Sequence, residues 1–114
     1  MWLMTPTSFL SVVHKECKPD ELLVRSRMKG HIEAVFPDAK VTEATRTDYR
    51  YRAVLPRSVV AQALADHAMT MTYDNYKNTV RENRFHDALA AVWSIMARLQ
   101  PTAPYTGRSQ SGML

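Results

Sequence analysis

The stretch YRYRAVL, at residues 49–55, alternates between two kinds of side chain with a period of two. Tyrosine, alanine and leucine occupy the odd positions, and arginine and valine occupy the even ones, a pattern typical of a β-strand with two different faces. Pro56 ends the strand, because proline cannot donate a ladder hydrogen bond. A partner strand is predicted at residues 40–45, joined to the first through a turn at residues 46–48.

An earlier hairpin is predicted from two short runs, at residues 9–13 and 22–28, that are rich in branched or aromatic side chains. The polar segment between them contains Pro19 and Asp20, which favour a turn. Residues 30–36 predict a short helix that ends before Pro37. The first half of the chain is therefore predicted to contain two hairpins separated by a helix.

The second half is predicted to be helical. Ser58 is the expected N-cap of a helix that runs to about Met69, and Thr72 or Asp74 is the expected cap of the next. That helix extends to Gln100, because apolar residues recur at alternating steps of four and three: Phe85, Leu89, Val92, Met96 and Leu99. The order ββαββαα predicts an α+β fold, a four-stranded antiparallel sheet with helices packed on one face and a long C-terminal helix that supplies much of the core.

Composition and charge limit the class of protein. The chain has 114 residues, 46% hydrophobic and 23% charged, as expected for one domain at residues 1–100 and a flexible tail at residues 101–114. Its net charge of +4 permits nucleic acid as a partner without requiring it. Cys17 is the only cysteine, which excludes an intrachain disulfide and a cysteine zinc cluster. With no signal peptide or membrane span in the sequence, we expect a cytoplasmic protein; its oligomeric state is left open.

Strand alternation places four arginines on one face of the predicted sheet. The odd positions of residues 49–55, Tyr49 and Tyr51 among them, should face the helices, as should the even positions of residues 22–28. If the two strands are neighbours, the open face carries a basic patch that suits phosphate or carboxylate: Arg25, Arg27, Arg50 and Arg52. The alternative is a solvated face balanced by Glu16, Glu21, Glu43 and Asp48. Burial of both tyrosines would leave the patch without exposed aromatic rings for base stacking.

A second candidate site is the polar and aromatic segment at the predicted start of the last helix: Tyr73, Asp74, Asn75, Tyr76 and Lys77. Free backbone N–H groups at a helix start bind anions, so this segment suits recognition. The alternative is a capping turn whose tyrosines cover the edge of the core. His86 and Asp87 form a third candidate, but no metal or nucleotide motif accompanies them, and we expect neither a cofactor nor a metal.

Several motifs together resemble a family of small bacterial proteins: MW-x-MT at residues 1–5, LVRSR at 23–27, TDYRYRA at 47–53, YDNYK at 73–77, and His86 with VW at 92–93. The resemblance covers about residues 1–100, and TDYRYRA is its most specific motif. It implies a bacterial cytosolic protein of one domain and no particular activity. The chain departs from the family pattern at residues 7–9, at Asn78 and at Leu89, where a Gly-Phe-Phe-like segment, an acid and a tyrosine are usual.

Three functional hypotheses remain. The first is a non-enzymatic interaction protein with an unidentified protein partner, because the core pattern is complete and no convincing catalytic set accompanies it. The second is a nucleic-acid-binding protein that uses the arginine patch on phosphates. The third is a small enzyme that uses His86, Asp87 and Asp74. We expect binding rather than catalysis.

Overall fold

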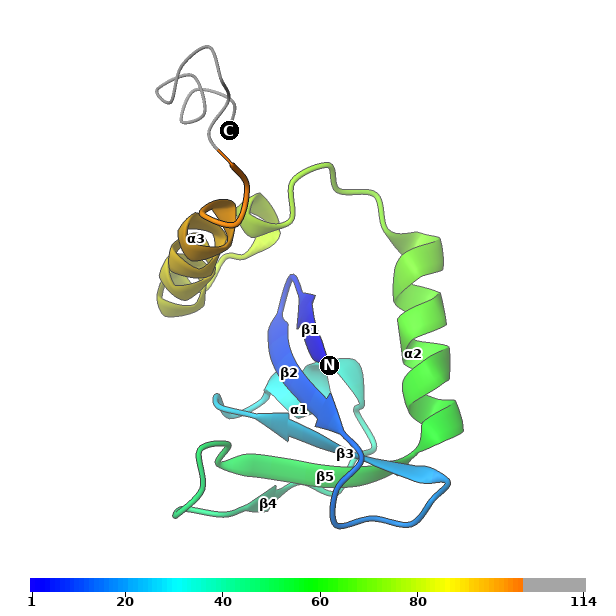
Figure 1. Cartoon of the computed structure of the whole chain (residues 1–114). Helices are drawn as coiled ribbons and strands as arrows, with labels where there is room; N and C mark the ends of the chain where they lie inside the picture. The colour runs from blue at the N-terminus through cyan, green and yellow to red at the C-terminus, as the bar shows by residue number, and fades with distance from the viewer. Residues whose placement is uncertain (102–114) are drawn as a thin grey trace. The chain divides into compact units, whose positions relative to one another are not determined.

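The computed structural model describes residues 1–101 (Figure 1). The chain divides into two compact units, Met1–Arg81 and Glu82–Leu114, of which the second is described as far as Pro101. Among the described residues, no helix combines the length and the apolar character needed to cross a membrane.

The first unit is a five-stranded antiparallel sheet with two α-helices, so the predicted α+β class is confirmed. The strands pair in the order β1-β2-β3-β5-β4. The two predicted hairpins are both present, as β2 with β3 and as β4 with β5. The elements are β1 (Trp2–Thr5), β2 (Ser8–Val13), β3 (Glu21–Ser26), α1 (His31–Val35), β4 (Thr42–Glu43), β5 (Tyr51–Pro56), α2 (Arg57–Thr70) and a 3₁₀ turn, η1 (Lys77–Thr79).

The predicted count of four strands is wrong, because β1 adds a fifth at the edge of the sheet. This strand pairs with β2 from Trp2 opposite Ser11 to Thr5 opposite Ser8. Four residues followed at once by Pro6 show too little alternation to predict a strand from sequence. The strand forms because β2 supplies its hydrogen-bonding partner, a long-range condition that local sequence does not contain.

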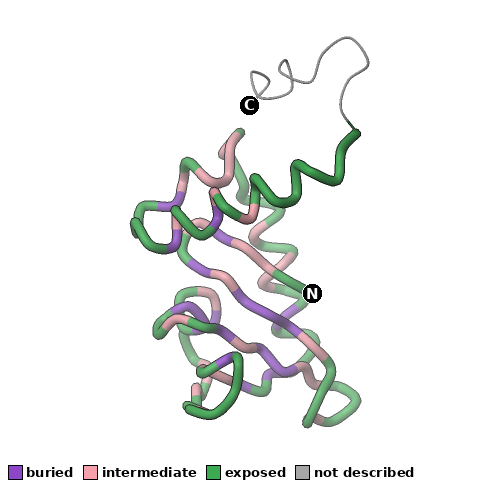
Figure 2. Tube along the Cα trace, turned by 60° about the vertical axis from the view of Figure 1, so that its left-hand side comes forward, coloured by how far each residue is buried: buried purple, intermediate pink, exposed green. Residues whose placement is uncertain are grey.

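The hydrophobic core lies between one face of the sheet and helices α1 and α2. Its sheet residues, which the strand register places on a single face, are Leu10, Val12, Val24, Ala53 and Leu55. Ile32 and Phe36 from the α1 region and Val60 from α2 complete it. Helix α3 (Asn83–Ala97) belongs to the second unit, where Phe85 and Leu89 are its buried residues. Figure 2 shows the buried positions concentrated along the strands.

The helix boundaries correct two further predictions. Helix α2 begins directly after β5 with Pro56 at the N-cap position, so Ser58 is not the cap. The last helix begins at Asn83 and not near Thr72 or Asp74, because the Glu82 carboxylate accepts the first free N–H groups at 3.1 and 2.6 Å. The segment before it is rich in Thr, Tyr, Asp and Asn, which have low helix propensity.

Two hydrogen bonds tie α1 to β2 and set the position of Phe9. The Ser8 hydroxyl donates to the carbonyl oxygen of His31 at 2.8 Å, and the Phe9 backbone N–H donates to His31 Nδ1 at 2.9 Å. Because Nδ1 accepts this bond, the neutral imidazole of His31 carries its proton on Nε2. The buried histidine therefore serves as an anchor between helix and sheet.

Candidate functional site

One row of residues crosses the whole sheet on the face that α1 and α2 leave open. Directly paired positions put their side chains on the same side of a sheet. The observed register aligns, strand by strand, Trp2, Ser11, Arg25, Arg52 and Thr42. Since neighbouring strands lie about 4.8 Å apart, the backbone distance from Trp2 to Arg52 is about 14 Å. We call this surface the open face.

Two arginines of the open face hold a buried tyrosine between strand and turn. The guanidinium carbons of Arg25 and Arg27 lie 4.4 and 4.3 Å from the centre of the Tyr49 ring, within the range of cation–π attraction. Tyr49 is only 5% exposed, as predicted, but it is buried against arginines and not against helices. The prediction failed because β5 begins at Tyr51, so strand alternation does not extend back to Tyr49. Tyr51 does pack against the core.

The four predicted arginines differ in how their charges are matched. Arg25 Nη2 donates to Ser11 Oγ at 2.8 Å and Arg27 Nη1 donates to the Asp48 carbonyl at 2.9 Å, while neither pairs with a carboxylate within residues 1–101. Arg25 Nε is buried without a hydrogen-bond partner in the same part of the chain. By contrast, two arginines form ion pairs: Arg50 with Glu43 at 3.1 Å and Arg52 with Glu16 at 3.8 Å. The Arg52 side chain is only 14% exposed. The unmatched positive charge of the open face therefore lies at Arg25 and Arg27.

Two aromatic side chains that sequence reasoning missed lie on this face. Trp2 stands in the same row as Arg25, and the pairing of Phe9 with Met4 places Phe9 on the same side. Their rings meet edge to face, with centres 5.3 Å apart and planes at 83°. Trp2 is 61% exposed. The open face therefore has the aromatic surface that it was expected to lack, and only the pairing of β1 reveals it.

The segment from Tyr73 to Lys77 is a turn fastened to the sheet and not the start of a long helix. The Tyr73 hydroxyl lies 3.2 Å from Nε2 of His67 on α2, and the Tyr76 hydroxyl donates to the Thr5 carbonyl at 2.8 Å. The two tyrosine rings are 6.0 Å apart. Lys77 begins only the three-residue turn η1, and the α-helix start on which the anion site was predicted lies at Asn83, outside this segment.

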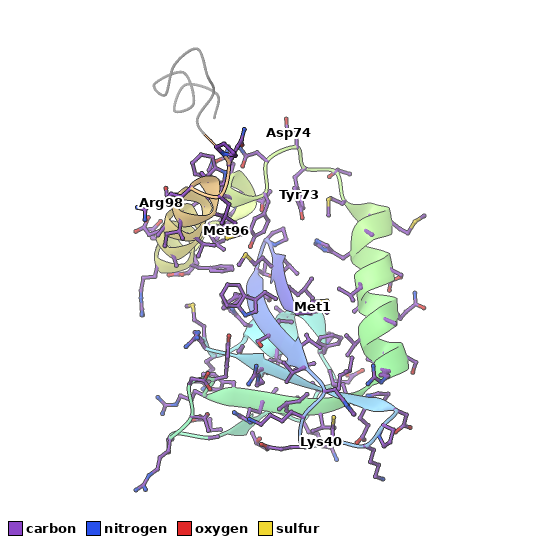
Figure 3. All side chains as sticks on the ribbon, viewed as in Figure 1. Met1, Lys40, Tyr73, Asp74, Met96 and Arg98 are labelled. Atoms are coloured by element: carbon purple, nitrogen blue, oxygen red, sulfur yellow. The ribbon has the colours of Figure 1, made fainter. Side chains whose placement is uncertain are left out.

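Within this segment, the polar side chains do not all share one direction. Tyr73 and Asp74 extend to opposite sides of the chain (Figure 3). Asp74 is exposed, whereas Asn75 is half-buried. The two tyrosines contact the rest of the unit, in agreement with the alternative that they cover the edge of the core.

Burial of the Tyr76 hydroxyl predicts a loss of stability at alkaline pH. Desolvation, followed by repulsion from Tyr73, raises the pKa of Tyr76 above its ordinary value of 10.0. A raised pKa in the folded state means that the neutral phenol stabilises the fold below pH 10 and that this contribution is lost as the pH rises further. We expect Tyr76→Phe to lower the free energy of unfolding by about 0.5–1.5 kcal/mol at neutral pH, through loss of the bond to Thr5. The difference should shrink above pH 10 in urea titrations.

The sharpest control for that prediction is Tyr73→Phe, because Tyr73 bonds to a side chain, that of His67, and not to the backbone of β1. This variant keeps the Tyr76 phenol, so we expect it to lose stability above pH 10 much as the wild type does. If the free energy of unfolding depends on pH in the same way for wild type and Tyr76→Phe, burial does not raise the pKa of the Tyr76 phenol.

The residues proposed for catalysis do not form a described cluster. His86 and Asp87 are neighbours on α3, with Nδ1 and Oδ1 3.9 Å apart, and the Asp87 side chain is exposed. Asp74 belongs to the first unit and the other two to the second. In residues 1–101 no three His, Cys, Asp or Glu side chains are grouped so that they would hold a metal ion.

Comparisons of this chain with known protein families, curated proteins and solved structures find no match.

Proposed function

We propose that this chain is a non-enzymatic binding protein whose open face binds single-stranded nucleic acid. The observation that carries the proposal is the row in which exposed Trp2 lies two strands from Arg25, an arginine with no carboxylate partner among residues 1–101. Phe9 and Arg27 extend the same surface. Aromatic rings beside arginines supply both requirements of such a ligand, since bases stack on the rings and phosphates bind the guanidinium groups.

The charge distribution favours a ligand with a backbone of regularly spaced negative charges. Arg25 and Arg27 share the ring of Tyr49, which holds their guanidinium groups in place and reduces the conformational entropy lost on binding. Trp2 and Phe9, whose rings meet edge to face, lie on the same face as these arginines. Stacking on a sheet requires unpaired bases, so the proposal specifies single strands and not a duplex.

The experiment is a fluorescence-anisotropy titration of labelled single-stranded RNA and DNA with the full chain at about 50 and 200 mM salt. We expect Trp2→Ala to weaken binding by about 1–3 kcal/mol, the value of one base stacked on an aromatic ring. Trp2→Phe should retain much of the affinity because it keeps a ring at the same place. A duplex of the same sequence should bind more weakly than either strand.

A matched control is Met69→Ala, which removes an exposed apolar side chain from α2, away from the open face. This variant should bind as the wild type does. The proposal fails if no probe binds at the lower salt concentration, or if Trp2→Ala leaves the affinity unchanged.

A protein partner is the second candidate function. A groove beside α2, on the opposite side of the sheet, specifically favours it.

A further inference from the structure

A groove runs beside α2 on the side of the sheet that carries the core. It consists of two adjoining hollows of about 490 and 410 Å³ that share three lining residues: Val35, Ala63 and Asp66. The larger hollow reaches Leu3 and Thr5 of β1, and the smaller one follows the first turns of α2. Since α2 has 14 residues, the groove follows a helix about 21 Å long. Its length suits an extended chain better than a compact ligand.

The charged side chains of this groove are acidic, although the whole chain has a net charge of +4. Among residues 1–101, Asp38 and Asp66 line it, whereas no Lys or Arg does. Asp66 accepts a hydrogen bond from Gln62 Nε2 at 2.8 Å and pairs with no cation among residues 1–101. His67, the histidine of the lining, is within hydrogen-bond distance of the Tyr73 hydroxyl. A ligand that fits this lining carries apolar groups and a positive charge.

Strand β1 presents a free edge beside the larger hollow. Met1 and Val12 exchange two backbone hydrogen bonds of 2.8 Å, so the next residue bonded to β2 is Leu3. The N–H and C=O groups of Trp2 and Met4 therefore point away from β2. No residue of β2 lines the hollow, and Figure 1 shows α2 on the side of β1 away from β2.

Within its four residues, β1 also carries none of the side chains that usually block pairing, and Pro6 follows directly after it. Natural edge strands are commonly blocked by lysine, by proline or by an inward-pointing charge. The four residues of β1, WLMT, contain none of these. The edge is therefore open to another strand, with a groove beside it to take that strand's side chains.

We propose that β1 and the groove bind an extended peptide segment of a partner protein, one with alternating apolar side chains and a Lys or Arg among them. The peptide backbone pairs with Trp2 and Met4 as a sixth strand. Every second side chain lies on the same face as Leu3 and enters the larger hollow, where the cation meets Asp66. Strand addition of this kind takes affinity from main-chain hydrogen bonds and specificity from alternate side chains.

Two other occupants match the groove less completely. A second copy of β1 brings no cation, so Asp66 and Asp38 would stay unpaired. A small organic cation would satisfy Asp66 but leave the free edge of β1 unused. The peptide site lies on the face opposite Arg25, so the proposal does not depend on nucleic-acid binding by the open face.

The test pans a phage-displayed library of random dodecapeptides against the immobilised full chain, then measures the enriched peptides in solution by anisotropy. We expect the enriched sequences to alternate apolar and other residues and to contain Lys or Arg. Ala63→Trp, which fills the shared part of the groove, and Asp66→Lys, which reverses its charge, should each weaken binding at least about tenfold. Met69→Ala, on the same helix but outside both hollows, should bind normally.

Two readouts test strand pairing directly. N-methylation should abolish binding at one alternate set of peptide positions and be tolerated at the other, because only one set donates to β1. The backbone amide resonances of Trp2 and Met4 should shift when the peptide is added.

The proposal is overturned if no peptide is enriched, or if Asp66→Lys, an exposed substitution that leaves the core intact, binds the peptides as the wild type does. Tolerance of N-methylation at both sets of positions would identify a different binding mode. Concentration-dependent self-association that Met4→Pro abolishes would instead identify a second copy as the occupant.

Discussion

The Arg25→Ala/Arg27→Ala variant is expected to lose roughly 100-fold or more of its affinity for single-stranded nucleic acid. These arginines are the ones on the open face without a carboxylate partner in the described part of the chain. A hydrogen bond to a charged group contributes about 1.5–3 kcal/mol, so two phosphate contacts together account for a loss of this size. Anisotropy titrations of the same single-stranded probes measure it.

The same variant should lose most of its salt dependence. For a single strand, two phosphate contacts weaken binding roughly sevenfold between about 50 and 200 mM salt. Once both guanidinium groups are removed, the residual binding rests on stacking, which depends little on salt. Measuring the slope therefore separates a lost phosphate contact from a general weakening.

Arg50→Ala is the matched control for this prediction. Arg50 lies at the rim of the sheet in an ion pair of 3.1 Å with Glu43, and both side chains are about half exposed. Its charge is already matched, so its removal should change affinity much less than the double variant does. If Arg50→Ala and the double variant weaken binding equally, nonspecific attraction to net charge explains the result and the open face does not.

Leu10→Ala is expected to lower the free energy of unfolding of the first unit by about 2–5 kcal/mol. Leu10 is 0% exposed and lies within the core formed by β2, β3, β5, α1 and α2. The substitution removes buried apolar surface and leaves a cavity that rigid neighbours fill only partly. A unit of about 80 residues has a total stability of roughly 4–12 kcal/mol, so this single change removes a large part of it.

Urea denaturation followed by circular dichroism measures this effect. Met69→Ala serves as the control, since Met69 is 85% exposed and its removal should change stability by no more than about 0.5 kcal/mol. A loss below about 1 kcal/mol for Leu10→Ala would mean that this residue is not at the centre of the core.

Local sequence patterns predicted the parts of the fold whose signals are short-range. The alternation at residues 49–55, the turn residues Pro19 and Asp20, and the break at Pro37 each reflect a backbone preference within a few residues, and the corresponding elements are present. Alternation also placed Arg25 and Arg52 on one face, and the register sets them directly opposite each other. Arg25 and Arg52 share this face because side-chain direction in a strand has a period of two.

Local patterns failed where a distant partner decides the conformation. Trp2 and Met4 become part of a strand only because β2 offers its edge, and Tyr49 leaves the core face because the strand begins two residues later. The start of α3 depends on the Glu82 side chain and not on the earlier capping candidates. Pairing and capping of this kind are chosen by competition among segments, which no single stretch reveals.

In the candidate site, too, some features follow from the sequence and others only from the tertiary structure. The sequence by itself determined that Arg25 and Arg52 would share a face once their strands paired, because side-chain direction alternates along each strand. Only the tertiary structure decided which arginines keep unmatched charge, since Glu43 and Glu16 reach Arg50 and Arg52 from other elements. It also decided that Trp2 joins them, because strand order and hydrogen-bond register arise from contacts between residues far apart in the chain.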